Sequence, residues 1–303
     1  MKWEDFQTSE NIEDRRGNDQ YADAGGRGSR VGAGGLGLGT MVVLGLIGWA
    51  LGINPAILIG GAEMLNNMRG GGQVAMPRQE APRTQPGAEP NDQMGRFVAK
   101  VLGENEEVWT QVLQTQKGIR FRPPTLVLYD GVTQSHCGAA QSAMGPFYCP
   151  IDQKIYLDTS FFRDMKRRFG GGGDFAYAYV ISHEMGHHIQ NQLGLLPKVQ
   201  RAQERASSRA EANALSVRVE LMADCLAGVW AANGNAKRKF LEEGDIEKAV
   251  ASAQAIGDDR VQKASRGYVV PDSFTHGSSA QRVQWLLKGL QFGKIDTCNT
   301  FAR

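Results

Sequence analysis

Two histidines and a glutamate form an H-E-x-x-H sequence at His183, Glu184 and His187. On a helix, positions i and i+4 lie on one face, so both imidazoles can point at one ion while Glu184 projects beside them. Zinc needs such convergence, with nitrogen ligands at about 2 Å in a tetrahedral array that leaves one position open. The pattern predicts a zinc site rather than two solvated histidines. The other candidates, His136 and His188, are expected to face solvent.

A third ligand is needed, and the metzincin continuation H-E-x-x-H-x-x-G-x-x-H is absent from the chain. A carboxylate from a second helix is the alternative. Glu220 and Asp224 are spaced i and i+4 beside an apolar run at 221–232, where unpaired acids would be costly. We expect Glu220 to bind the metal and Asp224 to accept the remaining N–H of a ligand histidine. The competing acids Glu204 and Glu211 lie on a polar stretch.

Three segments together resemble the bacterial "putative neutral zinc metallopeptidase" family: HEMGHH (183–188), VELMADCLAGVW (219–230) and SFTHGSSAQRV (273–283). GPFYCP (145–150) and IYLDTSFF (155–162) extend the resemblance over essentially the whole chain. The resemblance implies a single-pass membrane anchor, a gluzincin-like domain, a zinc cofactor, a peptidase-type site and a place in the bacterial envelope. It implies no particular substrate.

The residue types also predict how such a site would work. Zinc lowers the pKa of a bound water to about 7, and Glu184, which is not a ligand, is expected to act as general base. A donor for the oxyanion is expected as well, with His276 as the catalytic candidate and Arg282 and Tyr156 as others. The stretch 276–282 is similar to the H-P-x-x-x-R region of integral-membrane zinc peptidases, with glycine in place of proline. A capping or surface role for His276 and an ion-pair role for Arg282 stay open.

Hydrophobic spacing predicts an α+β domain at 92–303, mostly helical with a small antiparallel sheet. Helices are expected at 92–115, 174–194 (with Asp174 as N-cap), 200–233, 245–256 and 279–291. Strands are expected at 125–129, 145–149 and 154–157, the last two forming a hairpin across the turn at 150–153. The hairpin edge at about 153–158 is expected to bind an extended peptide by strand addition.

Residues 31–62 contain no charged residue, and about 20 apolar residues are enough to cross a bilayer as a helix. We expect a transmembrane helix there rather than a buried core helix or a cleaved signal peptide. Four arginines lie in the twenty residues before this segment and two in the twenty after it. This predicts a cytoplasmic tail at 1–30 and a periplasmic or otherwise extracytoplasmic domain on the bacterial inner membrane. Residues 63–91, rich in Pro and Gly, are expected to be a linker, and two GxxxG spacings near the span would allow a homodimer.

Four cysteines allow three disulfide pairings. In an oxidising compartment we expect Cys137–Cys149 to close a short loop and Cys225–Cys298 to pin the C-terminal segment to the helix of Glu220. Zinc ligation by Cys225 is the alternative. It is disfavoured because adjacent residues on a helix point about 100° apart.

The composition excludes some classes of protein. Lys and Arg number 34 against 32 Asp and Glu, so the net charge of +2 argues against nucleic-acid binding driven by basic charge. At 41% hydrophobic and 22% charged residues, the chain is expected to fold. Two functions remain: a membrane-anchored zinc endopeptidase that cleaves peptides or proteins, and a zinc-stabilised envelope binding or scaffold protein with little turnover. Only the first needs Glu184 as a base.

Overall fold

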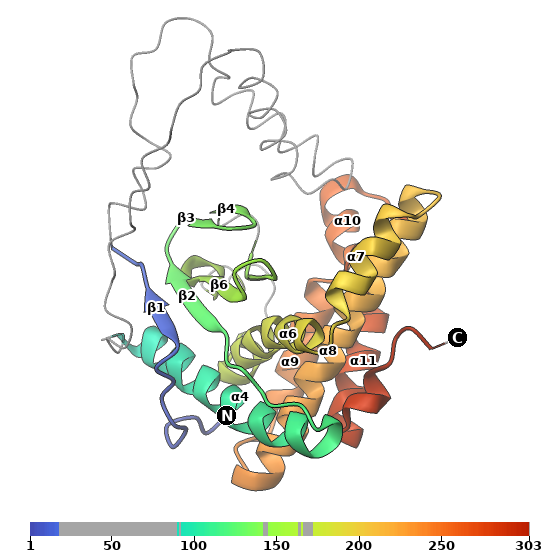
Figure 1. Cartoon of the computed structure of the whole chain (residues 1–303). Helices are drawn as coiled ribbons and strands as arrows, with labels where there is room; N and C mark the ends of the chain where they lie inside the picture. Colours follow the sequence, from blue (N-terminus) through green and yellow to red (C-terminus); the bar gives the residue numbers. More distant parts are fainter. Residues whose placement is uncertain (18–89, 91, 142–144, 163–164, 166–171, 303) are drawn as a thin grey trace, which may run out of the picture.

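A computed structural model describes residues 1–17, 90, 92–141, 145–162, 165 and 172–302. The strands lie on one side of the molecule, and α8, α9, α10 and α11 lie on the other (Figure 1). The helices are α4 (Gln93–Lys117), α6 (Asp174–Gln192), α7 (Leu196–Glu204), α8 (Arg209–Arg238), α9 (Asp245–Ala255), α10 (Asp258–Arg266) and α11 (Ser279–Phe292), with 3₁₀ turns η3 (Pro271–Ser273) and η4 (Ile295–Cys298). The strands are β1 (Ile12–Asp14), β2 (Thr125–Tyr129), β3 (Val132–Ser135), β4 (Gly138–Gln141), β5 (Phe147–Cys149) and β6 (Lys154–Asp158). This is the predicted α+β fold, mostly helical with a small sheet.

The main sheet is mixed, with strand order β1-β2-β6-β5. β1, β2 and β6 are parallel, and only β5 runs antiparallel to β6, so the expectation of an antiparallel sheet is correct for the β5–β6 hairpin alone. β3 and β4 form a separate antiparallel pair. The expected peptide-binding edge at 153–158 is wrong, because β6 pairs with β2 on one side and with β5 on the other. The edge strands of this sheet, within the described residues, are β1 and β5.

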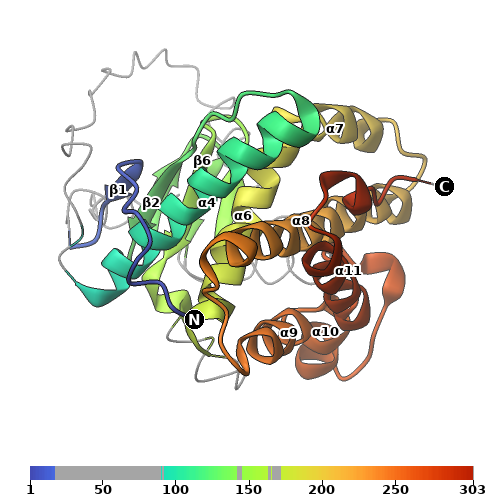
Figure 2. The ribbon, with the colours of Figure 1, turned by 90° about the horizontal axis from the view of Figure 1, so that it is seen from below.

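The two faces of the sheet pack against different partners, because successive side chains of a strand alternate. Leu126, Leu128, Ile155 and Leu157 join the main core with residues of α4 and α6. Figure 2 shows α4 lying alongside the strands. On the opposite face, a smaller cluster is formed by Val127, Tyr129, Ala140, Cys149 and Tyr156. Ala140 belongs to β4, so the β3–β4 pair covers this face.

Most predicted helices are present, with differences at their ends. α4, α9 and α11 match the expected ranges within two residues. The N-cap of α6 is Gly173, and Asp174 lies in the first turn instead. The single helix expected at 200–233 is two helices, because Ser208 accepts a hydrogen bond from the N–H of Glu211 and starts α8 anew. The sequence did not predict α10.

Residues 1–17 pack against the domain instead of forming a separate tail. β1 pairs with β2, and Phe6 is buried with its ring edge-on to Phe240 near the end of α8. Arg16 forms an ion pair with Asp92, the N-cap of α4. A chain that crossed a bilayer once between β1 and α4 would put β1 and β2 on opposite faces. The expected tail and domain on either side of a single crossing are therefore incompatible with this packing.

The predicted transmembrane segment at 31–62 lies outside the described residues, as do its GxxxG spacings and nearly all of the linker at 63–91. Among the helices that the structure does describe, none combines the length and the apolar character that crossing a bilayer requires.

Candidate metal centre

The three predicted metal ligands come together between α6 and α8. His183 and His187 lie on one face of α6, with ring centroids 4.9 Å apart, and Glu220 faces them from α8. The carboxylate oxygens of Glu220 lie 3.1 Å from Nε2 of His183 and 3.5 Å from Nε2 of His187. In the part of the chain that the structure describes, this is the one group of three or more His, Cys, Asp or Glu residues that could hold a metal ion. Its ligand atoms all lie within 4.8 Å of one another.

Gly186 allows the two helices to approach this closely. A Cβ atom at Gly186 would lie 3.0 Å from the carbonyl oxygen and 3.1 Å from the Cα of Ala223 on α8. Both contacts involve backbone atoms, which cannot turn aside as the end of a side chain can. The glycine inside the H-E-x-x-H sequence therefore has a packing role, which is to bring the helix of Glu220 against the helix of the histidines.

Asp224 orients His183 as expected from the sequence. Its Oδ1 lies 2.8 Å from Nδ1 of His183, and both side chains are buried. Because an ionised carboxylate only accepts hydrogen bonds, Nδ1 is the donor, and Nε2 is the nitrogen that faces Glu220 and is available to a metal when it loses its proton.

His187 is oriented by a neutral partner, Gln190. The amide nitrogen of Gln190 donates to the carbonyl oxygen of Val219 at 2.7 Å, and this bond fixes which end of the amide is the oxygen. That oxygen lies 3.0 Å from Nδ1 of His187, which must therefore donate. Gln190 thus holds the ring of one ligand while it binds the residue that precedes the third ligand, Glu220.

The charges around these side chains favour a cation. Burial opposes a charge on His183, but the Asp224 carboxylate outweighs burial and raises the pKa of His183 to about 10. Against the same effect of burial, Glu220 raises the pKa of His187. Burial also opposes ionisation of Glu220, but His187 and His183 hold its pKa well below the usual range. Two imidazole nitrogens and one carboxylate are the donor set of zinc sites with an open position, so these residues fit a zinc ion.

Glu184 is the buried carboxyl group beside the ligands. Burial raises its pKa, and the nearby His183 and His187 offset part of this shift. A carboxylate with a raised pKa is a stronger base, which suits it to accept a proton from water and to return it. Glu184 is thus a buried carboxyl group on the helix of the two ligand histidines.

His276 lies in the loop before α11, and this loop packs on α8 beside Glu220. A Cβ atom at Gly277 would contact Leu221 and Val217 of α8. The His276 side chain is 53% exposed, and its Nδ1 lies 3.4 Å from Oδ1 of Asp258. Although partial burial opposes it, the bond to Asp258 and the nearby Glu220 raise the pKa of His276. Oδ2 of Asp258 also accepts hydrogen bonds from three backbone N–H groups of the loop, those of Thr275, His276 and Gly277.

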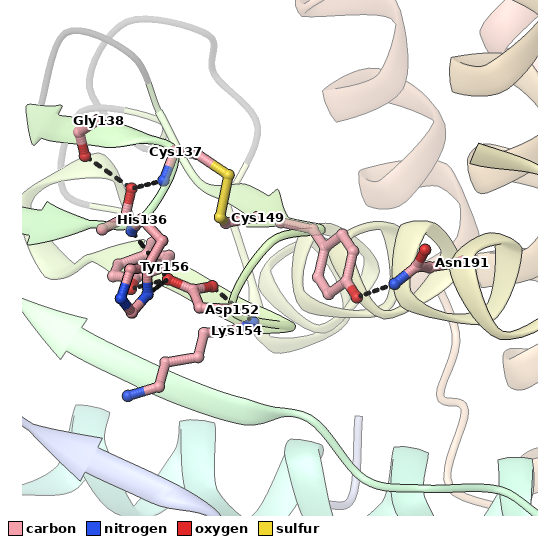
Figure 3. The surroundings of a disulfide bond; sticks show 10 residues. His136, Cys137, Gly138, Cys149, Asp152, Lys154, Tyr156 and Asn191 are labelled. Carbon is pink, nitrogen blue, oxygen red and sulfur yellow. Dashed lines mark hydrogen bonds and ion pairs between the residues drawn. A yellow bond between two sulfur atoms is a disulfide. The ribbon is translucent and has the colours of Figure 1, made fainter. Parts of the chain in front are cut away.

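The two other candidate oxyanion donors do not face the site. Arg282 is buried, and its guanidinium donates to Asp224, so its ion-pair role is the correct alternative. Tyr156 is buried on the sheet face that β3 and β4 cover, and its hydroxyl donates to Asp152 (Figure 3). The prediction of Arg282 or Tyr156 as the oxyanion donor was therefore wrong. The residue type shows that a side chain can donate a hydrogen bond, but it does not show which neighbour accepts that bond in the fold.

Three residues of the site were missed by the sequence analysis: Tyr179, Gln190 and Asp258. Tyr179 lies one helical turn before His183, and Gln190 lies one turn after His187, so helical spacing alone could have placed them on the ligand face. Asp258 has no such signal, because it lies far from His276 in sequence and reaches it only through the fold.

The two remaining histidines differ. The side chain of His136 is 76% exposed, as expected. The prediction for His188 was wrong, because this residue is buried between α6 and the sheet. Its Nδ1 lies 3.1 Å from the hydroxyl of Tyr148, and its Nε2 lies 2.7 Å from the carbonyl oxygen of Arg122. Burial lowers the pKa of His188 to about 4.

Both predicted disulfides are present. Cys137–Cys149 links the β3–β4 pair to β5 (Figure 3). Cys225–Cys298 links α8 to η4, and this bond excludes Cys225 as a zinc ligand.

Comparisons with known proteins agree with this site. The family described as "Putative neutral zinc metallopeptidase" matches residues 1–301. The chain is 43% identical over 304 residues to the uncharacterized protein YpfJ of Escherichia coli (strain K12), which covers 100% of this chain and 99% of YpfJ. It is 42% identical over 192 residues to the uncharacterized protein Rv2575 of Mycobacterium tuberculosis (strain ATCC 25618 / H37Rv), which covers 60% of this chain and 64% of Rv2575. No solved structure matches the chain significantly.

Proposed function

The chain belongs to the family described as putative neutral zinc metallopeptidase, and from this premise we propose that it is a zinc-dependent endopeptidase that hydrolyses peptide bonds in peptides or proteins. The observation that carries the proposal is the buried Glu184 beside the cluster of His183, His187 and Glu220. A zinc site that only stabilises a scaffold needs no buried base next to its ligands, so Glu184 favours an enzyme.

Each residue has a role that follows from its position. His183, His187 and Glu220 would hold zinc, which when bound supplies a Lewis acid and lowers the pKa of water. Glu184 takes the proton of the attacking water and later delivers it to the leaving amine. His276, whose Nδ1 lies 3.4 Å from Oδ1 of Asp258, would donate from Nε2 to the developing oxyanion.

The proposal is tested with the zinc-loaded full chain and two glutamate variants. Hydrolysis of casein and of a fluorogenic peptide library is expected in the wild type. Glu184→Gln should lower the rate roughly 10²- to 10⁴-fold with unchanged zinc content, as for the loss of a general base. Glu243→Gln, at an exposed position, should change neither quantity. A zinc-loaded wild type that cleaves nothing, or a fully active Glu184→Gln variant, would refute the proposal and favour the scaffold.

We also propose that the domain lies in the bacterial envelope, outside the cytoplasm, because its two disulfides are typical of oxidising compartments. Anchorage of residues 31–62 in a bilayer is part of this proposal. Since residues 1–17 pack with the domain, such an anchor leaves both its ends on the same face of the membrane. Cysteines introduced at Glu10 and Lys294 should then react equally with a membrane-impermeant maleimide in spheroplasts, and labelling of only one would contradict it.

A further inference from the structure

A buried arginine lies behind the metal-ligand cluster. Arg282 of α11 is 3% exposed, and its guanidinium faces Asp224 of α8 in a two-pronged contact. Its Nε donates to Oδ2 at 2.9 Å, and its Nη2 donates to Oδ1 at 2.9 Å. Two parallel hydrogen bonds of this kind fix both the distance between the guanidinium and the carboxylate and the plane in which the carboxylate lies.

The same carboxylate binds two residues of α6. Oδ1 of Asp224 accepts from the hydroxyl of Tyr179 at 2.6 Å and from Nδ1 of His183 at 2.8 Å. Nη2 of Arg282 also lies 3.3 Å from the Tyr179 hydroxyl. Four side chains from three helices therefore form one buried network, and only His183 among them is a metal ligand.

We propose that Arg282 is a positioning residue of the zinc site, which acts through Asp224 to hold His183 in the geometry that binds metal. The proposal rests on the zinc site described above and adds a residue to it. Without the guanidinium, the buried Asp224 carboxylate would keep only the Tyr179 hydroxyl and His183, both on Oδ1, and nothing would hold its Oδ2 in plane. With it, the carboxylate is compensated in charge and held in plane, so the imidazole stays directed at Glu220.

The structure explains why α11 can place Arg282 so firmly. α8 and α11 meet backbone to backbone one turn further on. A Cβ atom at Gly228 would clash with the carbonyl oxygen of Leu286, and one at Gly289 would clash with the carbonyl oxygen of Cys225. The disulfide Cys225–Cys298 then ties α8 to the turn after α11.

The start of α11 is fixed as well. Ser278 and Gln281 form a capping box, in which each side chain binds the backbone of the other residue. His276 lies just before this cap, and Arg282 lies one turn into the helix. The rigid element that carries Arg282 therefore also fixes the loop of His276 against α8.

The test is a double-mutant cycle between Arg282 and Asp224, read as the zinc dissociation constant from chelator competition. Arg282→Met and Asp224→Asn should each weaken zinc binding by roughly 10- to 100-fold, the usual effect of losing a partner of a metal-bound histidine. The double variant should bind zinc within about twofold of Asp224→Asn alone, because Arg282 acts only through that carboxylate. Arg282→Lys keeps the charge but loses the two parallel N–H donors, so it should bind zinc more tightly than Arg282→Met and less tightly than the wild type.

A matched control separates positioning from stability. Arg238, the last residue of α8, forms ion pairs with Glu104 and Glu107 far along that helix from the ligand Glu220. Arg238→Met should lower the melting temperature and leave the zinc affinity unchanged. Should Arg282→Met fail to fold, Tyr179→Phe removes one hydrogen bond to Asp224 without a charge change, and it should weaken zinc binding a few-fold.

Two results would overturn the proposal. Unchanged zinc affinity in folded Arg282→Met or Tyr179→Phe protein would make the network a structural ion pair only. A loss in the double variant equal to the product of the two single losses would mean that Arg282 does not act through Asp224. Zinc affinity needs no turnover, so an inert protein with the expected cycle would refute the peptidase and leave this inference intact.

Discussion

His183 and His188 belong to the same helix, α6, but they face opposite sides of it and lie in opposite electrostatic surroundings. His183 faces α8, where Asp224 and Glu220 lie within hydrogen-bond distance. His188 faces the sheet, where it contacts the hydroxyl of Tyr148, a backbone carbonyl oxygen and the neutral amide of Gln192. Both are buried, yet the pKa of His183 is raised to about 10 and that of His188 is lowered to about 4.

The difference shows that burial alone does not decide the charge of a histidine. Burial acts against the charged form of both rings, and only the carboxylates on the α8 side reverse its effect. His188 also has no free nitrogen. Its Nδ1 lies 3.1 Å from the Tyr148 hydroxyl, and its Nε2 lies 2.7 Å from both the Arg122 carbonyl oxygen and the amide nitrogen of Gln192. The face of α6 that carries His183 is thus suited to bind a cation. The face that carries His188 keeps its histidine neutral.

The largest expected effect comes from removing the carboxylate that faces both ligand histidines. Glu220→Gln should weaken zinc binding by roughly 10²- to 10³-fold, since about 10–16 kcal/mol of binding is shared among the ligands of a typical zinc site. Metal analysis after dialysis would measure this, with the exposed Glu211→Gln on the same helix as control. Equal zinc content in Glu220→Gln and wild type would remove Glu220 from the ligand set.

A second effect concerns the sheet face and depends on pH. In the folded protein the pKa of His188 is about 4, below the ordinary value of 6.5, so in this window the unfolded chain binds the proton and the folded chain does not. The stability that His188 contributes is complete above about pH 6.5 and is lost as the pH falls towards 4. The wild type should therefore lose up to about 3 kcal/mol more than His188→Gln between these limits.

Urea unfolding of the metal-free proteins at several pH values checks this difference. Other groups, His183 included, titrate alike in both proteins and cancel. The contribution of His183 has the opposite sign: its folded pKa is raised, so its stability is present below about pH 6.5 and is lost as the pH rises towards 10. Parallel curves for wild type and His188→Gln would contradict the assignment of His188 as a buried neutral residue.

The smallest effect on zinc affinity is expected from removing the partner of His187, the second ligand histidine. His183 is oriented by a carboxylate, and His187 by the neutral amide of Gln190. Gln190→Leu removes this partner and the bond to Val219, and we expect roughly a 10-fold loss of zinc affinity, at the weak end of such effects. A loss larger than that of Asp224→Asn would show that the neutral partner matters more than the charged one.

Much of the fold could be predicted because its signals are local. The apolar spacing of α4, the strand of 125–129 and the hairpin of β5 and β6 all depend on neighbours a few residues apart. The β3–β4 pair was missed, and β1 was missed for two reasons. β1 has three residues, too few for a pattern, and it pairs with a strand more than a hundred residues later in the chain.

The residues of the candidate site can be divided in the same way, into those placed by local sequence and those placed by the fold. The sequence alone determined that His183, Glu184 and His187 share a helix and that Glu220 and Asp224 share another, because the pitch of an α-helix sets which side chains lie on one face. Only the tertiary structure decided that Arg282 binds Asp224, that Asp258 holds His276, and that His188 faces the sheet. These contacts depend on how closely helices pack and at which residues they meet, as at Gly186 and Gly228, and helical periodicity carries no information about such meetings.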